Sequence, residues 1–196
     1  MHAHDFSDVA RFEAMFDAPD RDAWQHPDDV VALLGLSPAM TVADLGTGTG
    51  YFLARLSRAV PEGRVLALDV EPAMIDHVRA RAEHEGLANV EARVVAPDDP
   101  GLSAASVDRV LCVDTWHHIG ARAEYLARLA PMLRPGGTLL IVDFTREAEH
   151  GPPPAMRLSA DDVTAELAAA GWTAAILDED LPMHWIVRAT PPAGVR

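Results

Sequence analysis

Apolar residues along the chain alternate between short consecutive runs and longer segments with helical spacing. Consecutive apolar runs, typical of strands buried on both faces, predict strands over 41–45, 64–69, 90–95, 108–113, 138–144, 173–179 and 183–189. Segments with apolar residues at helical spacing predict helices over 8–16, 28–35, 50–59, 72–85, 120–133 and 160–170. Strands that alternate with helices indicate an α/β protein with a doubly wound, mostly parallel sheet.

The end of the chain departs from the parallel pattern. Only residues 180–182 separate the last two predicted strands, so we expect these strands to pair as an antiparallel hairpin. The pattern therefore predicts a three-layer α/β/α sandwich with a seven-stranded sheet whose last strand is antiparallel. The length of 196 residues suits a single domain over 1–196, with an N-terminal helical cap over 1–40, a core over 41–145 and a C-terminal helix and hairpin over 146–196.

Charge and cysteine content narrow the classes of function. The formal net charge is −14, and all 16 basic side chains are Arg, so we expect neither a nucleic-acid partner nor an anionic membrane partner. Cys112 is the only cysteine, which excludes an internal disulfide and a cysteine-based metal site. The first 16 residues carry charges throughout and resemble no secretory signal, so we expect a cytoplasmic protein. Monomer and homodimer both remain open.

The loop after the first predicted strand has the most informative sequence, VADLGTGTGYF. Asp44 closes the strand, and Gly46, Gly48 and Gly50 alternate before the next helix. Glycines permit tight turns and close approach of a ligand to the backbone, and a helix N-terminus favours a carboxylate. Because Asp44 can meet an ammonium group, a ligand with an amino-acid tail fits this loop.

Two other glycine-rich motifs and a simple turn compete with this interpretation. A phosphate-binding P-loop requires a Lys after its glycines, and the chain has no Lys. The dinucleotide fingerprint requires a third glycine where Tyr51 stands. A glycine-rich turn without a ligand is the remaining alternative.

The segment VADLGTGTG resembles the S-adenosylmethionine motif of class I methyltransferases, which have a Rossmann-like fold, and LRPGGTLLIVDF is a second similar segment. The resemblance spans residues 41–145 and implies that S-adenosylmethionine is the cofactor. It implies that the backbone of Gly46 to Gly48 cradles the methionine part and that Asp44 contacts its ammonium group. The candidate cofactor residues of this loop are Asp44, Gly46, Thr47, Gly48 and Tyr51.

Acidic residues after the second and third predicted strands are further cofactor candidates. Asp69 can accept hydrogen bonds from both ribose hydroxyls, although it can also serve as a helix N-cap ahead of Pro72. Val70 and Met74 can pack against adenine, or belong to an ordinary core. The resemblance implies an acid that binds the adenine amino group near Asp98, but Ala-Pro stands in place of the usual Gly-Asp.

The segment CVDTWHHI after the fourth predicted strand holds the candidate catalytic residues. The resemblance places this loop beside the transferred methyl group, with the backbone of Val113 at the methionine end. His117, His118 and Asp114 are the polar candidates, because a His of near-neutral pKa suits a proton acceptor. The alternative is that one His orders the turn through a backbone hydrogen bond. Adjacent His residues do not converge on one metal ion, so we expect no metal.

Both ends of the chain are candidates for a lid over the substrate. The combination of RDAWQHP, WHHI, GPPPAMRLS and a final LPMHW resembles one subgroup of bacterial methyltransferase-like proteins. A capping helix pair and a surface loop are the alternatives for the two candidate lid segments. We therefore expect methyl transfer to a small molecule at O, N or C. A non-catalytic S-adenosylmethionine-binding or interaction module, a protein methyltransferase and a nicotinamide oxidoreductase are the alternatives.

Overall fold

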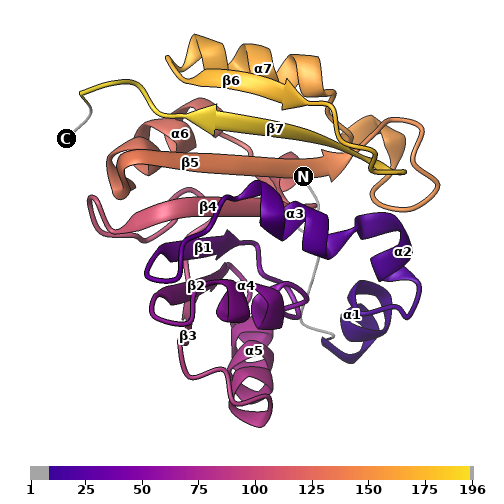
Figure 1. Cartoon of the computed structure of the whole chain (residues 1–196). Coiled ribbons are helices and arrows are strands. Elements are labelled where there is room, and N and C mark those ends of the chain that lie inside the picture. Colours follow the sequence, from indigo (N-terminus) through magenta and orange to yellow (C-terminus); the bar gives the residue numbers. More distant parts are fainter. Residues whose placement is uncertain (1–8, 195–196) are drawn as a thin grey trace.

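The computed structural model describes residues 9–194 and contains one seven-stranded sheet (Figure 1). Its strands are β1 (Thr41–Leu45), β2 (Arg64–Asp69), β3 (Val90–Val94), β4 (Val107–Val113), β5 (Leu133–Phe144), β6 (Thr173–Leu177) and β7 (His184–Thr190). They lie in the order β3-β2-β1-β4-β5-β7-β6. Strand β7 is antiparallel to both of its neighbours, and the remaining pairs are parallel, which confirms the predicted sheet and its Rossmann-like class.

Seven α-helices and three short 3-10 helices surround the sheet within the described residues. The α-helices are α1 (Val9–Phe16), α2 (Arg21–Gln25), α3 (Pro27–Leu33), α4 (Leu53–Ala59), α5 (Pro72–His84), α6 (Arg122–Leu129) and α7 (Ala160–Ala169). The 3-10 helices are η1 (Trp116–His118), η2 (Ala130–Met132) and η3 (Pro154–Met156). No helix in the described part of the chain is long and apolar enough to cross a membrane.

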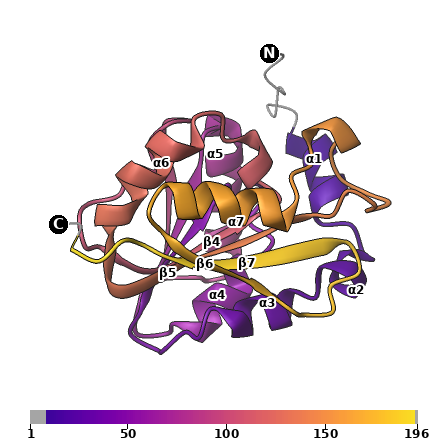
Figure 2. The ribbon, with the colours of Figure 1, turned by 90° about the horizontal axis from the view of Figure 1, so that it is seen from above.

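The helices bury the sheet on both faces, as the apolar strand sequences require. One core cluster joins the strands to α3, α4 and α5, and the other joins them to α6 and α7. Figure 2 shows α3 and α4 on one side of the sheet and α6 and α7 on the other. Strand alternation directs successive side chains to opposite faces, so Val42 of β1 packs in the first cluster and Ala43 in the second.

The strand order creates one edge at which a ligand site is expected. The chain winds outward from β1 to β2 and β3, and then returns to β4 on the other side of β1. Ligands of such sheets bind beyond the carboxyl ends of the strands, where this order reverses. Figure 1 shows α1, α2 and the loop after β5 gathered at that edge, so two parts of the chain that are distant in sequence lie beside the reversal point.

The differences from the predicted elements have local causes. Residues 47–52 form turns, so α4 begins at Leu53 rather than at residue 50. The helix predicted over 120–133 ends as α6 at Leu129 and continues as η2, because Pro131 lies in that stretch. Helix α2, with five residues, is too short to show a helical period and was not predicted. Residue 8 of the first predicted helix lies outside the described residues.

Candidate functional site

A cavity of about 1040 Å³ opens at the carboxyl edge of the sheet. Its walls come from α1, α2, the loops after β1 to β5 and the start of α5. All but one of the predicted site residues line it: Asp44, Gly46, Thr47, Gly48, Tyr51, Asp69, Val70, Met74, Val113, Asp114, His117 and His118. These predicted residues therefore border one continuous cavity, and their roles stay predictions.

The loop after β1 adopts left-handed backbone angles that favour glycine over other residues. Gly46 and Gly48 have φ values of +74° and +54°, in the left-handed region. A Cβ on Gly46 would lie 2.2 Å from Oγ1 of Thr115, so no other residue fits between the two loops. The backbone N–H groups of Gly46 and Thr47 donate to the carbonyl of Leu68 at 2.8 and 3.0 Å, which fastens the loop to β2.

Asp44 is a buried carboxylate at the start of this loop. The residue is 3% exposed, and its pKa is raised from 3.8 to about 6, mainly because it is buried and to a smaller extent because the charge of Asp69 is nearby. The hydroxyl of Thr47 donates to Asp44 at 2.8 Å and opposes this rise. The fold therefore buries an acid whose ionised form would be stabilised by a cationic ligand.

Asp69 occupies the end of β2, next to the same loop. Its carboxylate accepts from the backbone N–H groups of Gly48 at 2.9 Å and Glu71 at 3.0 Å, and burial raises its pKa. The N-cap of α5 is Glu71, not Asp69. Met74 is buried against the cavity, whereas Val70 is 49% exposed, so the two residues frame an apolar entrance beside Asp69.

Two predicted cofactor residues have other partners. The hydroxyl of Tyr51 donates to Asp22 of α2, and the guanidinium of Arg21 lies 4.0 Å from the centroid of its ring. Tyr51 therefore ties α2 to the glycine loop. The structure does not bring Asp98 to the cavity lining, because its carboxylate pairs with Arg128 at 3.0 Å on the surface and Pro97 lines the cavity beside it.

Asp114 connects three parts of the chain. It has a φ of +52°, and its carboxylate accepts from Nε2 of His184 on β7 at 2.8 Å and from Arg21 of α2 at 3.3 Å. Trp24 of α2 stacks on His184, with ring centroids 5.7 Å apart. Asp114 therefore holds the N-terminal cap against the sheet.

His117 forms a pair with Asp143 at the end of β5. Nδ1 of His117 lies 2.8 and 2.9 Å from the two carboxylate oxygens of Asp143, and both side chains are only 2% exposed. The backbone N–H of His117 donates to Asp143 as well, at 3.1 Å. The ring of His118 lies 4.1 Å from that of His117 on the exposed side, and Trp116 is fully buried in the core.

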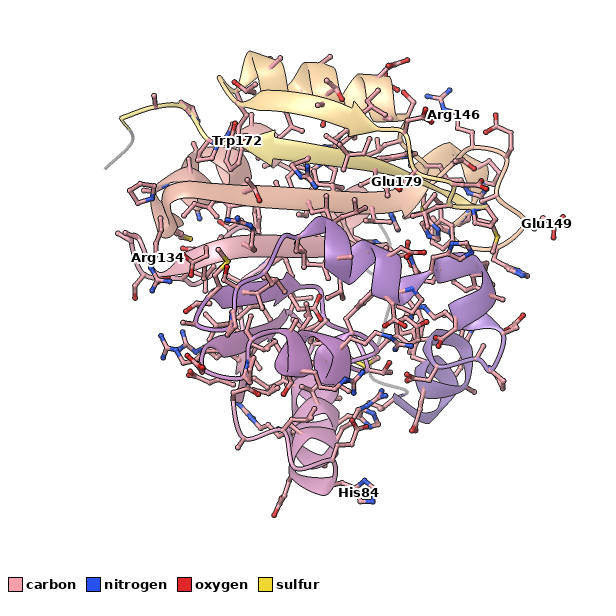
Figure 3. All side chains as sticks on the ribbon, in the orientation of Figure 1. His84, Arg134, Arg146, Glu149, Trp172 and Glu179 are labelled. Atoms are coloured by element: carbon pink, nitrogen blue, oxygen red, sulfur yellow. The ribbon has the colours of Figure 1, made fainter. Side chains whose placement is uncertain are left out.

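The loop after β5 lines the remaining side of the cavity, and Figure 3 shows its residue Glu149 at the same end of the molecule as α1 and α2. Arg157 is 9% exposed and organises this loop by donating to five backbone carbonyls. These carbonyls belong to Thr145, Arg146, Ala148, His150 and Pro152, at 2.6 to 3.2 Å. A single guanidinium therefore fixes the predicted lid segment.

Sequence reasoning missed the roles of Arg21, Asp143, Arg157 and His184, although Arg21 and Arg157 lie in the candidate lid segments RDAWQHP and GPPPAMRLS. Asp143 carried a usable signal, because it is an isolated acid near the end of an apolar strand, in the same position as Asp44 and Asp69. Such an acid is buried at the ligand edge of a parallel sheet. The other three residues act through partners that the sequence does not place next to them.

Comparisons with known proteins agree with this geometry. The family model described as a methyltransferase domain matches residues 42–137. A crystal structure of a SAM-dependent methyltransferase from Aquifex aeolicus has 29% identity and a TM-score of 0.87, over 95% of this chain and 98% of that one.

Among curated proteins, an uncharacterized methyltransferase of Mycobacterium tuberculosis is 33% identical over 71% of this chain and 54% of its own length. A malonyl-[acyl-carrier protein] O-methyltransferase of Hahella chejuensis is 32% identical over 50% of this chain and 34% of its own length. The chain spans about half or less of the length of these curated relatives. Together with the fold, these similarities show that the chain belongs to the class I S-adenosylmethionine-dependent methyltransferases.

Proposed function

We propose that this chain binds S-adenosylmethionine in the cavity and transfers its methyl group to a small molecule. The observation that carries the proposal is the pair of buried carboxylates, Asp44 and Asp69, on either side of a left-handed glycine loop at the point where the strand order reverses. A pyrophosphate is repelled by two such acids, whereas an aminoacyl nucleoside offers an ammonium group to one and ribose hydroxyls to the other.

The residues present fit this cofactor. Asp44 has a raised pKa because it is buried, and a ligand ammonium group would stabilise its ionised form. The backbone from Gly46 to Gly48 lines the cavity and would hold the methionine part, and Asp69 would accept hydrogen bonds from the ribose hydroxyls. Val70 and Met74 provide apolar contacts for adenine, and Val113 borders the methionine end.

The chain's own part in the reaction is to position the acceptor and exclude water. The bound cofactor supplies an electrophilic methyl group, so a nucleophile held in line with it is sufficient for transfer. The aromatic side chains Phe12 and Phe16 of α1 and Trp24 of α2 cover the cavity and keep its interior apolar. Ordered helices and the lid held by Arg157 maintain this enclosure.

A small acceptor suits the enclosure. Pockets for small ligands measure about 300–1,000 Å³, and a cavity of about 1040 Å³ at the top of this range leaves room for an acceptor beside the cofactor. The net charge of −14 opposes a nucleic-acid acceptor.

Calorimetric titration tests the first step of the proposal. Wild type is expected to bind S-adenosylmethionine at one site per chain and to show no heat with NAD⁺. Asp69→Asn is expected to bind about tenfold to a hundredfold more weakly, because it loses a charged hydrogen-bond acceptor. Asp76→Asn, an exposed acid of α5, is the matched control and should bind as wild type does.

Catalysis is tested with a labelled methyl donor and a cell extract. Label in small molecules supports the proposed reaction. Label in polypeptides would instead identify a protein as the methyl acceptor and contradict the small-molecule acceptor. No label in either fraction, together with tight cofactor binding, would identify a non-catalytic binding module and contradict the transfer step.

A further inference from the structure

The acceptor end of the cavity is separate from the cofactor residues along the sheet edge. Asp44 and Asp69 belong to β1 and β2, whereas His117 follows β4 and Phe144 ends β5, on the other side of the reversal point. Phe144 faces an aromatic group, because the rings of Trp24 and His184 lie 6.3 and 4.5 Å from its ring. A planar apolar molecule is therefore favoured at this end.

His117 brings one polar nitrogen to that apolar end. An ionised carboxylate only accepts hydrogen bonds, so Nδ1 of His117 carries a hydrogen and donates it in the hydrogen bond to Asp143. Nε2 therefore keeps its lone pair, because both ring contacts with Asp143 use Nδ1. Asp143 also accepts from the backbone N–H groups of His117 and Phe144, at 3.1 and 2.8 Å, which fixes the carboxylate behind the ring.

On the basis of the proposed function, we infer that His117 is the general base for O-methylation of a hydroxyl group on an aromatic acceptor, with Asp143 as its positioning residue. The acceptor oxygen forms a bond to the methyl carbon as the bond from that carbon to sulfur breaks. Sulfur keeps the electron pair, and the hydroxyl proton passes to Nε2 of His117. Asp143 stabilises the imidazolium that results.

The charged groups around His117 and Asp143 are compatible with a general base at His117. The charge of Asp143 acts on Arg122 of α6, but Nε and Nη2 of Arg122 donate to Glu166 of α7 at 2.6 and 2.7 Å, and its Nη1 donates to the carbonyl of Ile119 at 2.9 Å. The thiol of Cys112 on β4 stays neutral, because burial raises its pKa. Among residues 9–194, His118 is the titratable group whose ring contacts that of His117, and Asp143 is the carboxylate that pairs with His117.

The test uses 4-nitrophenol, an aromatic alcohol whose ionised form is yellow, and measures binding without methyl transfer. Wild type is expected to bind this probe and to shift its ionisation to lower pH, because Nε2 of His117 takes the proton. His117→Gln should bind the probe without that shift. His84→Gln, at the exposed end of α5 far from the cavity (Figure 3), is the matched control and should behave as wild type does.

Two further readouts separate catalysis from simple support of the loop. Nitrogen NMR of the imidazole should show one tautomer in wild type and a mixture in Asp143→Asn. With an accepted phenol, His117→Gln should lower kcat on the order of 10²- to 10⁴-fold with little change in KM, and remove the acidic limb of the pH profile.

The outcomes distinguish this inference from the proposed function. Failure of phenols to bind a chain that binds S-adenosylmethionine, or an unchanged ionisation shift in His117→Gln, would overturn the inference and leave the proposed function intact. Preferential binding of aromatic amines would also overturn the assignment of a hydroxyl group as the methyl acceptor. Failure to bind S-adenosylmethionine would overturn the proposed function itself.

Discussion

Arg21 of α2 and Asp114 of the loop after β4 lie 93 positions apart in the chain and form an ion pair of 3.3 Å at the edge of the cavity. Arg21 also donates to Gln25 at 3.1 Å and to the carbonyl of Phe16 at 2.6 Å. One largely buried guanidinium therefore joins the two cap helices to the loop that carries His117, and the cap is part of the site.

Replacement of Arg21 by Ala should weaken the contact between the two cap helices and the loop after β4. We expect the free energy of unfolding to fall by about 1–3 kcal/mol, because partly buried acceptors lose a charged donor. Urea unfolding measures the change. Arg79→Ala removes an exposed ion pair with Asp76 and should change stability by less than about 0.5 kcal/mol. Equal losses in the two variants would contradict the role assigned to Arg21.

Asp44 should make the ligand-free protein less stable as the pH rises. Its folded pKa of about 6 exceeds the ordinary value of 3.8, so folding favours the protonated form. The stability it contributes is present below pH 3.8 and is lost as the pH rises through about 6, with a total of about 3 kcal/mol. Asp44→Asn should therefore gain about this much relative to wild type between pH 4 and pH 8. A constant difference between the two proteins across this range would refute the prediction.

Cofactor affinity should have the opposite dependence on the same group. An ammonium group pairs with the ionised carboxylate, so affinity for S-adenosylmethionine should increase as the pH rises through about 6. Below that pH, binding should release a proton, which calorimetry detects in buffers of different ionisation enthalpy. In Asp44→Asn both effects should disappear. An unchanged pH dependence in that variant would assign the effect to another group.

Arg157 should stabilise the lid without contacting the cofactor. Arg157→Ala removes five hydrogen bonds to backbone carbonyls, and we expect a loss of at least about 2 kcal/mol in unfolding free energy. Acceptor binding should weaken more than cofactor binding does. Arg146→Ala is the matched control, because this exposed side chain on the same loop pairs only with exposed Asp162 among the described residues. A weaker effect for Arg157 than for Arg146 would contradict this account.

The fold was predictable because its signals are local. Apolar runs such as TLLIVDF reveal buried strands, and the short link before β7 reveals the antiparallel hairpin. The three-residue difference between the predicted start of this helix at residue 50 and the observed start of α4 at Leu53, in contrast, follows from turns that the glycine spacing does not specify. The cofactor side of the site was equally local, since Asp44 and Asp69 each follow a strand directly.

The acceptor side was less predictable, because its contacts are long-range. His117 was a candidate from sequence, but its partner Asp143 lies 26 positions away on the next strand of the sheet. His184 reaches Asp114 across 70 positions through the antiparallel β7. Asp98 shows the converse, since a loop acid with the expected position along the chain pairs with Arg128 outside the cavity. These contacts depend on how the loops lie relative to one another in space, which the pattern of apolar and polar residues does not specify.

A crystal structure of the chain with S-adenosylhomocysteine tests the central claim most directly. The account predicts that the ligand's ammonium group lies at Asp44, its ribose hydroxyls at Asp69, and its sulfur toward the His117 side of the cavity. A ligand seated elsewhere, or a cavity that the chain's own side chains fill under saturating ligand, would contradict it.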